Sequence, residues 1–149
     1  LMEALWTSDR LNLARYDSLQ PGYSIVHRAE YERELAAGCH KYGLGVIPYS
    51  PLAAGFLTGK YRKDKPLPES VRSASAQKHM TAQNWAVLDK LESLGKTRGK
   101  SISQMALGWL LSRQEITAPI IGPRTIEQLN DNIGAAGLRL SAAEMETLE

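Results

Sequence analysis

A tyrosine and a serine stand directly after a short apolar segment, followed by a glycine-containing loop and a lysine. Tyr49 and Ser50 follow residues 45–48, and Gly55 and Lys60 come shortly after them. An aromatic ring at the end of a buried strand can stack on an aromatic ligand. A hydroxyl and the free N–H groups of a glycine loop suit a pyrophosphate. The pattern is typical of a ligand-binding loop after a barrel strand. The residues alone also allow Tyr49 to cap the core and Lys60 to be a solvated surface cation.

A second candidate anion site precedes a helix near the end of the chain. Arg124 follows Gly122 and stands just before a helix predicted over residues 125–136. The start of a helix attracts anions, and the planar guanidinium suits a phosphate monoester. Three polar residues recur at helical spacing and share one face with Thr125: Gln128, Asp131 and Asn132. Two simpler interpretations stay open, because Gln128 also completes a capping box with Thr125 and Asn132 suits any polar helix position.

The order of elements predicts an α/β fold with a parallel sheet. Short apolar strands that alternate with helices are typical of βα units. Strands are predicted at residues 17–20, 45–48 and 118–121, and helices at 2–15, 29–42, 84–97, from 101, 125–136 and from 141. Gly43 is expected in the left-handed conformation that ends a helix, and Ser101–Gln104 and Ser141–Glu144 are expected to form capping boxes. Residues 55–80 are predicted to be one long connection.

Size and composition limit the possible architectures and partners. The chain has 149 residues, whereas a closed (β/α)₈ barrel usually needs about 250. The formal net charge is only +2, with no basic cluster, so nucleic acid is not an expected partner. No apolar run is long enough for a membrane helix. The single cysteine, Cys39, fits a reducing cytoplasm, as a buried apolar side chain or, alternatively, a nucleophile. No spacing of histidines and carboxylates indicates a metal site.

Three segments together resemble the carboxy-terminal half of the aldo-keto reductases. They are Gln20-Pro21-x-Tyr23-Ser24, the run from Gly43 to Tyr61 that contains Tyr49-Ser50-Pro51-Leu52-Ala53, and Ile121-Gly122-x-Arg124-Thr125-x-x-Gln128-Leu129-x-x-Asn132. The branch that they resemble includes bacterial general-stress reductases and potassium-channel β-subunits. The resemblance implies a partial (β/α)₈ TIM barrel with about three βα units, strands six to eight, and a terminal helix. Residues 1–149 would form a single partial-barrel domain with a dinucleotide site, and residues 1–15 would be the remnant of a preceding barrel helix.

The resemblance also implies which residues bind NADPH. Gln20, otherwise a turn residue, would contact the nicotinamide amide, and Tyr49 would stack on the nicotinamide ring. Ser50, Leu52, Ala53, Gly55 and Lys60 would line the pyrophosphate. Gly122, Arg124, Gln128, Asp131 and Asn132 would hold the adenosine and its 2′-phosphate. The family often has a glutamate where this chain has Asp131, so the resemblance implies that this contact is either shorter or lost. Arg72 matches a loop arginine of the channel-subunit branch.

By resemblance, the chain is a truncated, NADPH-dependent oxidoreductase that reduces reactive aldehydes and ketones, such as dicarbonyls. No residue matches the tyrosine, lysine, aspartate and histidine with which the family catalyses the reaction, so the catalytic residues are unknown. The alternative is an NADP(H)-binding module, or a fragment that turns over only when an amino-terminal half complements it. Unpaired strand edges favour a homo-oligomer or pairing with such a half. The expected ligand is a small carbonyl substrate. Neither nucleic acid nor a membrane is an expected partner, and the expected location is the cytoplasm.

Overall fold

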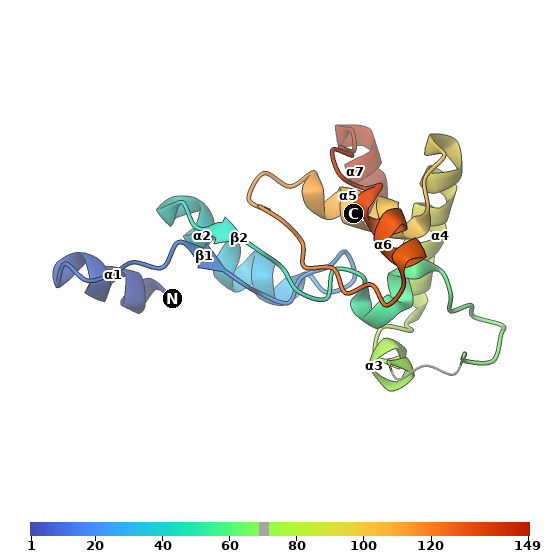
Figure 1. The fold of residues 1–149 in the computed structure, drawn as a ribbon, viewed down its shortest axis with the longest axis horizontal. Helices are drawn as coiled ribbons and strands as arrows, with labels where there is room; N and C mark the ends of the chain where they lie inside the picture. The colour runs from blue at the N-terminus through green and yellow to red at the C-terminus, as the bar shows by residue number, and fades with distance from the viewer. Residues whose placement is uncertain (69–71) are drawn as a thin grey trace.

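The computed structural model describes residues 1–68 and 72–149. Figure 1 shows a helix-rich chain with two short strands. The helices are α1 (Met2–Arg10), α2 (Ala36–Tyr42), α3 (Ser73–Gln77), α4 (Ala82–Arg98), α5 (Ile102–Leu111), α6 (Ile126–Ile133) and α7 (Ala142–Leu148). The strands are β1 (Ser18–Leu19) and β2 (Gly45–Val46), with a π-helical segment η1 (Tyr31–Leu35) and a 3₁₀ segment η2 (Ala53–Thr58).

The two strands form a parallel sheet, as the α/β prediction required. Ser18 pairs with Gly45 and Leu19 with Val46. Both strands are shorter than predicted. The two segments nevertheless stay side by side beyond the strands, because the backbone N–H of Tyr49 donates to the carbonyl of Pro21 at 2.9 Å. Prolines at 21 and 48 lack the N–H that a continuous ladder needs. Tyr49 is therefore held at the end of β2 by backbone bonds to the β1 side.

The prediction of a third strand over residues 118–121 is wrong. A parallel bridge instead joins Ile116 to Val46, and the N–H of Ile120 donates to the carbonyl of Pro48 at 2.8 Å. The N–H of Val46 donates to the side-chain oxygen of Thr117, at 3.2 Å, and not to a backbone carbonyl. The Thr117 side chain thus takes the place of a backbone acceptor, and Pro119 has no N–H to donate. Together they interrupt the ladder of backbone hydrogen bonds that a third strand needs. The segment still runs beside β2 and leads towards Gly122.

Three predicted segments differ from the structure in their boundaries or in their content. The first helix ends at Arg10 rather than residue 15, and Asn12 then takes a left-handed conformation with φ of 52°, which asparagine tolerates. The helix predicted over 29–42 contains the π-helical segment η1. The connection predicted over 55–80 holds the end of η2 and all of α3, and its residues 69–71 lie outside the described part of the chain.

Local capping signals are confirmed at most of the predicted helix ends. Gly43 ends α2 with φ of 60°. Ser101 and Gln104 form a complete capping box at α5, and Ser141 and Glu144 form another at α7. The capping box predicted at α6 is wrong in one half, because the Gln128 side chain accepts from Arg124 rather than from Thr125.

The core lies where α4 and α5 pack against η2 and the segment after β1. Trp109 of α5 is fully buried, with its ring centroid 5.5 Å from that of Tyr23. The Arg113 guanidinium covers the Trp109 ring at 4.4 Å. In Figure 1, α1 lies at one end of the long axis, far from α4–α7 at the other. Its neighbourhood exposes six large apolar side chains: Leu1, Met2, Trp6, Leu11, Leu13 and Tyr16.

Candidate functional site

The two segments singled out in the sequence line one common cavity of about 920 Å³. One wall runs from Tyr49 to Lys60, and the other from Ile120 to Asn132. Ten of the twelve predicted residues line it: Tyr49, Ser50, Leu52, Gly55, Lys60, Gly122, Arg124, Gln128, Asp131 and Asn132. A cavity of this size is in the range of small-molecule and cofactor sites.

Two predicted residues do not line the cavity. Gln20 is exposed just after β1, and Ala53 is only 1% exposed, within the core. The N–H of Ala53 donates to the carbonyl of Ser50 at 3.0 Å, and this turn carries the Ala53 side chain inwards. Its neighbour Ala54 lines the cavity instead.

Several lining residues were not among those predicted. Ser75 comes from α3, Ser103 from α5 and Glu127 from the first turn of α6. Arg72, which the resemblance matched to a loop arginine of the channel-subunit branch, also lines the cavity. No local signal identifies Ser75, Ser103 or Glu127, because their access to the cavity depends on how separate helices pack.

The loop after β2 has an unusual backbone conformation. Ser50, Ala53 and Ala54 have positive φ angles of 55°, 48° and 54°, and each such non-glycine residue costs about 1–3 kcal/mol. Gly55 has a φ of 91°, and a Cβ added there would lie 3.0 Å from Cε of Lys60. Strain of this kind is common at ligand-binding loops. The absent side chain at Gly55 lets Lys60 lie close to the loop.

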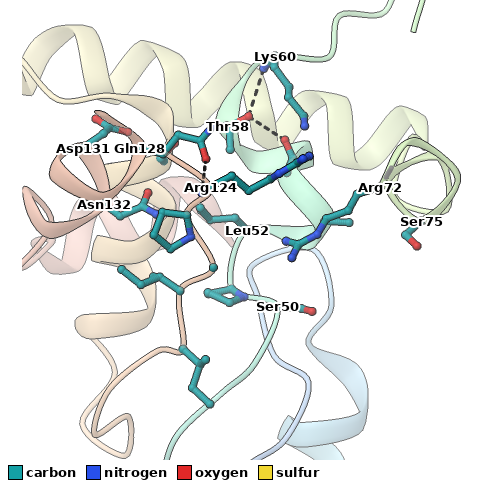
Figure 2. A pocket seen from close by; sticks show the side chains of 18 of the residues that line it. Ser50, Leu52, Thr58, Lys60, Arg72, Ser75, Arg124, Gln128, Asp131 and Asn132 are labelled. Carbon is teal, nitrogen blue, oxygen red and sulfur yellow. Dashed lines mark hydrogen bonds between the residues drawn. The ribbon is translucent and has the colours of Figure 1, made fainter. Parts of the chain in front are cut away.

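The end of the loop is fixed by the Thr58 hydroxyl. This O–H group donates to the carbonyl of Gly55 at 2.8 Å, and its oxygen accepts from the N–H of Lys60 at 3.4 Å. Both bonds are drawn in Figure 2. The ammonium of Lys60 lies 4.9 Å from the centre of the Tyr61 ring. Thr58 therefore holds the backbone on which Lys60 is presented to the cavity.

Cations from three separate segments line the cavity: Lys60, Arg72 and Arg124. Figure 2 shows Gln128, Asp131 and Asn132 on one side, Lys60 and Arg72 on the other, and the Arg124 side chain reaching between them. The Arg124 guanidinium has no hydrogen-bond or ion-pair partner within residues 1–68 and 72–149. Three positive side chains around one cavity suit a ligand with more than one phosphate.

The start of α6 is built around Arg124 and Gln128. The Thr125 hydroxyl accepts from the N–H of Gln128 at 3.3 Å, while Oε1 of Gln128 accepts from the N–H of Arg124 at 2.9 Å. Hydrogen bonds from its own backbone N–H and from Thr125 lower the pKa of Glu127, so that carboxylate is ionised at neutral pH. Because Glu127 repels anions near the helix start, Arg124 is the group there that can attract a phosphate.

The far side of the cavity is formed where α5 meets α6. Oδ2 of Asp131 accepts from the Ser101 hydroxyl at 3.0 Å, and its carbonyl accepts from Nε2 of Gln104 at 2.9 Å. Asn132 follows, only 8% exposed, and its amide has no hydrogen-bond partner in the described part of the chain. This side therefore combines a tethered carboxylate with an amide that is available to a ligand.

Comparison with known proteins identifies the family. A model of the aldo/keto reductase family matches residues 2–149. The chain belongs to the aldo/keto reductase family. It is 38% identical over 122 residues to the uncharacterized oxidoreductase YrpG of Bacillus subtilis, covering 81% of this chain and 36% of that protein. Members of this family are oxidoreductases with a (β/α)₈ barrel fold and nicotinamide cofactors, so the resemblance recognised in the sequence is confirmed.

Two further relatives of this aldo/keto reductase chain have named activities. The chloroplastic pyridoxal reductase of Arabidopsis thaliana is 33% identical over 132 residues, covering 89% of this chain and 35% of that protein. The L-glyceraldehyde 3-phosphate reductase of Escherichia coli O157:H7 is 32% identical over 139 residues, covering 87% and 40% respectively. The chain thus spans well under half the length of these curated relatives.

Metal-binding clusters and membrane-spanning helices are both absent from the described residues. Across residues 1–68 and 72–149, no three histidine, cysteine, aspartate or glutamate side chains are arranged to hold a metal ion. In the same part of the chain, no helix has the length and apolar character needed to cross a bilayer.

Proposed function

We propose that this aldo/keto reductase chain binds NADPH in the cavity between the Tyr49–Lys60 loop and α6, and that it serves the reduction of reactive aldehydes and ketones such as dicarbonyls. The observation that carries the proposal is the meeting of an exposed aromatic ring, a glycine loop and three cations around one cavity. A dinucleotide has the matching groups, namely a flat ring, a pyrophosphate and a further phosphate.

The cavity fits such a cofactor in specific ways. Tyr49 is 50% exposed, which leaves its ring able to stack. Gly122 carries no side chain, and a Cβ there would meet only Arg72, at 3.7 Å. In this proposal Ser50, Gly55 and Lys60 hold the pyrophosphate, and Arg124 holds the 2′-phosphate. Gln128, Asp131 and Asn132 line the adenosine.

When bound, reduced NADPH supplies a hydride to the carbonyl carbon of the substrate. The role of Tyr49 is to orient the nicotinamide by stacking, which selects the face that meets the substrate. Lys60 and Arg124 neutralise phosphate charge and thereby fix the dinucleotide along the cavity. Reduction also needs a proton donor within hydrogen-bond reach of the carbonyl oxygen, and no residue of the chain matches the family's donor.

We also propose that the chain forms three βα units of the family's barrel, strands six to eight and a terminal helix, as one domain over residues 1–149. Residues 1–15 then belong to a preceding barrel helix. The support is the parallel pairing of β1 and β2 and the bridge from β2 to Ile116. Exposed Trp6, Leu11 and Tyr16 favour a homo-oligomer or an amino-terminal half as the partner of this end. The proposed location is the cytoplasm.

A second candidate is an NADP(H)-binding module without turnover, unless an amino-terminal half complements it. The chain covers 36% of one relative and 40% of another, and its cavity is lined by groups that suit the binding of the cofactor. It shares the cavity and the cofactor with the first proposal and differs only in chemistry.

Binding is tested by titrating NADPH fluorescence with the wild-type chain, Arg124→Ala and Arg33→Ala. Arg33 is a matched control, because its side chain is 74% exposed and outside the cavity. Removing a charge-assisted bond to the 2′-phosphate should weaken NADPH binding by about 10- to 100-fold and weaken NADH binding far less. No binding to the wild-type chain would contradict both candidates.

Turnover is tested by following NADPH oxidation with a dicarbonyl, which needs little acid assistance. The reductase proposal expects a measurable rate that falls in Tyr49→Ala. Binding without oxidation supports the module, and adding an amino-terminal half from a relative should then restore the rate. An equal rate in Tyr49→Ala would contradict hydride transfer at this cavity.

A further inference from the structure

A second cavity lies between the loop after η2 and α4, and it shares no lining residue with the first cavity. Its volume is about 450 Å³, which is in the range of small-molecule sites. One wall is formed by residues 62–65 and the other by one face of α4. Figure 1 shows residues 62–65, in green, beside α4. This cavity is therefore separate from the site proposed for NADPH.

The wall from α4 combines an apolar floor with a carboxylate. Trp85, Leu88 and Asp89 stand at helical spacing and share one face of α4. Leu88 is only 1% exposed. The Trp85 ring meets the Phe56 ring edge-on, with the two centroids 4.9 Å apart, so its position is fixed by the core. The floor thus offers an ordered aromatic ring to a ligand, with Asp89 one residue beyond the floor.

An ion pair joins the two walls at one point. Nη1 of Arg62 lies 3.2 Å from Oε2 of Glu92, and the other oxygen of Glu92 lies 3.6 Å from Nζ of Lys96. The carbonyl of Arg62 accepts from the N–H of Lys65 at 3.3 Å, which turns the loop back over the cavity. Arg62 and Glu92 therefore satisfy each other and hold the loop against α4.

The remaining charges of the two walls have opposite sign. Lys63, Asp64 and Lys65 on the loop and Asp89 on α4 line the cavity, and their side chains form no ion pair within residues 1–68 and 72–149. Two ammonium groups and one carboxylate leave the loop wall net positive, whereas Asp89 leaves the α4 wall negative. A ligand with a single charge is attracted by one wall and repelled by the other. A ligand that carries both charges suits both walls.

We infer that this second cavity binds a zwitterion of the amino-acid class with an apolar side chain. Its carboxylate meets Lys63 and Lys65, its ammonium group meets Asp89, and its side chain lies on Trp85 and Leu88. Because exposed ion pairs contribute little, the apolar contact supplies most of the affinity and the charges select the ligand. The inference does not depend on the binding of NADPH.

Binding is tested by titrating the chain with L-phenylalanine and following the indole N–H signals by NMR. The chain has three tryptophans, and the Trp85 signal is the one that disappears in Trp85→Phe. L-Phenylalanine should shift the Trp85 signal with a dissociation constant of about 1–10 mM, as expected for a ligand of its size. The signals of Trp6 and Trp109, which lie outside this cavity, should stay in place.

Three analogues test the parts of the ligand separately. 3-Phenylpropionate lacks the ammonium group and 2-phenylethylamine lacks the carboxylate, so each should bind about 1.5- to fivefold more weakly than L-phenylalanine. Glycine keeps both charges but has no apolar side chain. It should not shift the Trp85 signal at the same concentrations.

Matched variants assign each charge of the ligand to its wall. Asp89→Asn should weaken the binding of L-phenylalanine without weakening that of 3-phenylpropionate. The double variant Lys63→Gln, Lys65→Gln should weaken L-phenylalanine without weakening 2-phenylethylamine. Lys90→Gln, exposed on α4 and outside the cavity, should bind like the wild type. Equal thermal midpoints check that the variants keep the fold.

The other outcomes overturn the inference. An unmoved Trp85 signal, or equal shifts of all three indole signals, would show that the cavity is not a specific site. Equal binding of L-phenylalanine and both aromatic analogues would show that the charges do not select the ligand. Tighter binding of either analogue would assign the cavity to a simple anion or a simple amine instead.

Discussion

The ring of Tyr49 lies directly over the backbone of Gly22. A Cβ added to Gly22 would lie 3.0 Å from both Cζ and the hydroxyl oxygen of Tyr49. The two residues also form a parallel bridge, and the N–H of Tyr23 donates to the carbonyl of Tyr49 at 3.3 Å. The turn after β1 thus supports one side of the ring while Tyr49 remains half exposed. A stacking role for Tyr49 depends on this support.

Gly22→Ala is expected to displace the Tyr49 ring and weaken NADPH binding. Because aromatic stacking contributes about 0.5–1.5 kcal/mol, the loss should be about two- to twelvefold. Titration of NADPH fluorescence measures it. In a Tyr49→Ala background the same change should have no further effect, and a full additional loss there would show that Gly22 acts by another route.

Gln128→Ala is expected to loosen Arg124 rather than only to remove a ligand contact. The Gln128 side chain accepts from the backbone N–H of Arg124, so its loss frees the residue that would meet the 2′-phosphate. One hydrogen bond is worth about 1 kcal/mol, so NADPH binding should weaken about fivefold, with a smaller change for NADH. Gln83→Ala, exposed on α4, is the control. An equal loss for both dinucleotides would favour direct contact with the adenosine instead.

The sequence predicts best where one or two neighbouring residues decide the structure. Gly43 and the capping pair Ser101–Gln104 behave as expected because their signals are local. The third strand fails because its pairing depends on Thr117, whose hydroxyl takes the N–H of Val46. No window around residues 116–121 contains that information.

In the candidate site, too, the residues marked by local sequence patterns were predicted, and those that depend on long-range packing were not. The loop from Tyr49 to Lys60 and the start of α6 were both predicted, and they do line one cavity. Ser103 was not predicted, because the capping box of Ser101 and Gln104 already accounts for the polar residues around it. Only the packing of α5 beside α6 brings Ser103 to the cavity. The roles of these residues in binding NADPH stay predictions.

Gly108→Ala is expected to destabilise the chain, although alanine favours helices. A Cβ on Gly108, inside α5, would lie 2.6 Å from Cδ2 of Leu138. Overpacking of this kind costs about 1–3 kcal/mol, which exceeds the helical preference of about 1 kcal/mol. Denaturant unfolding measures the difference. Leu138→Ala in the same chain should relieve the clash, so the two changes should be strongly non-additive; simple additivity would contradict it.

The carboxylate of Glu144 is expected to make stability depend on pH in the acid range. Hydrogen bonds from Arg98, and from Ser141 at the cap of α7, lower the pKa of Glu144 from 4.5 to about 2. The folded state therefore favours the ionised form, so the stabilisation is fully present above pH 4.5 and is lost as the pH falls towards 2.

Glu144→Gln removes this stabilisation at every pH. Its thermal midpoint should lie below that of the wild type at pH 7, and the difference should shrink below pH 4.5 and vanish near pH 2. Glu146→Gln, exposed on the same helix, should follow the wild-type curve throughout. A constant difference between the wild type and Glu144→Gln from pH 7 down to 2 would show that packing or capping, and not ionisation, is what Glu144 contributes.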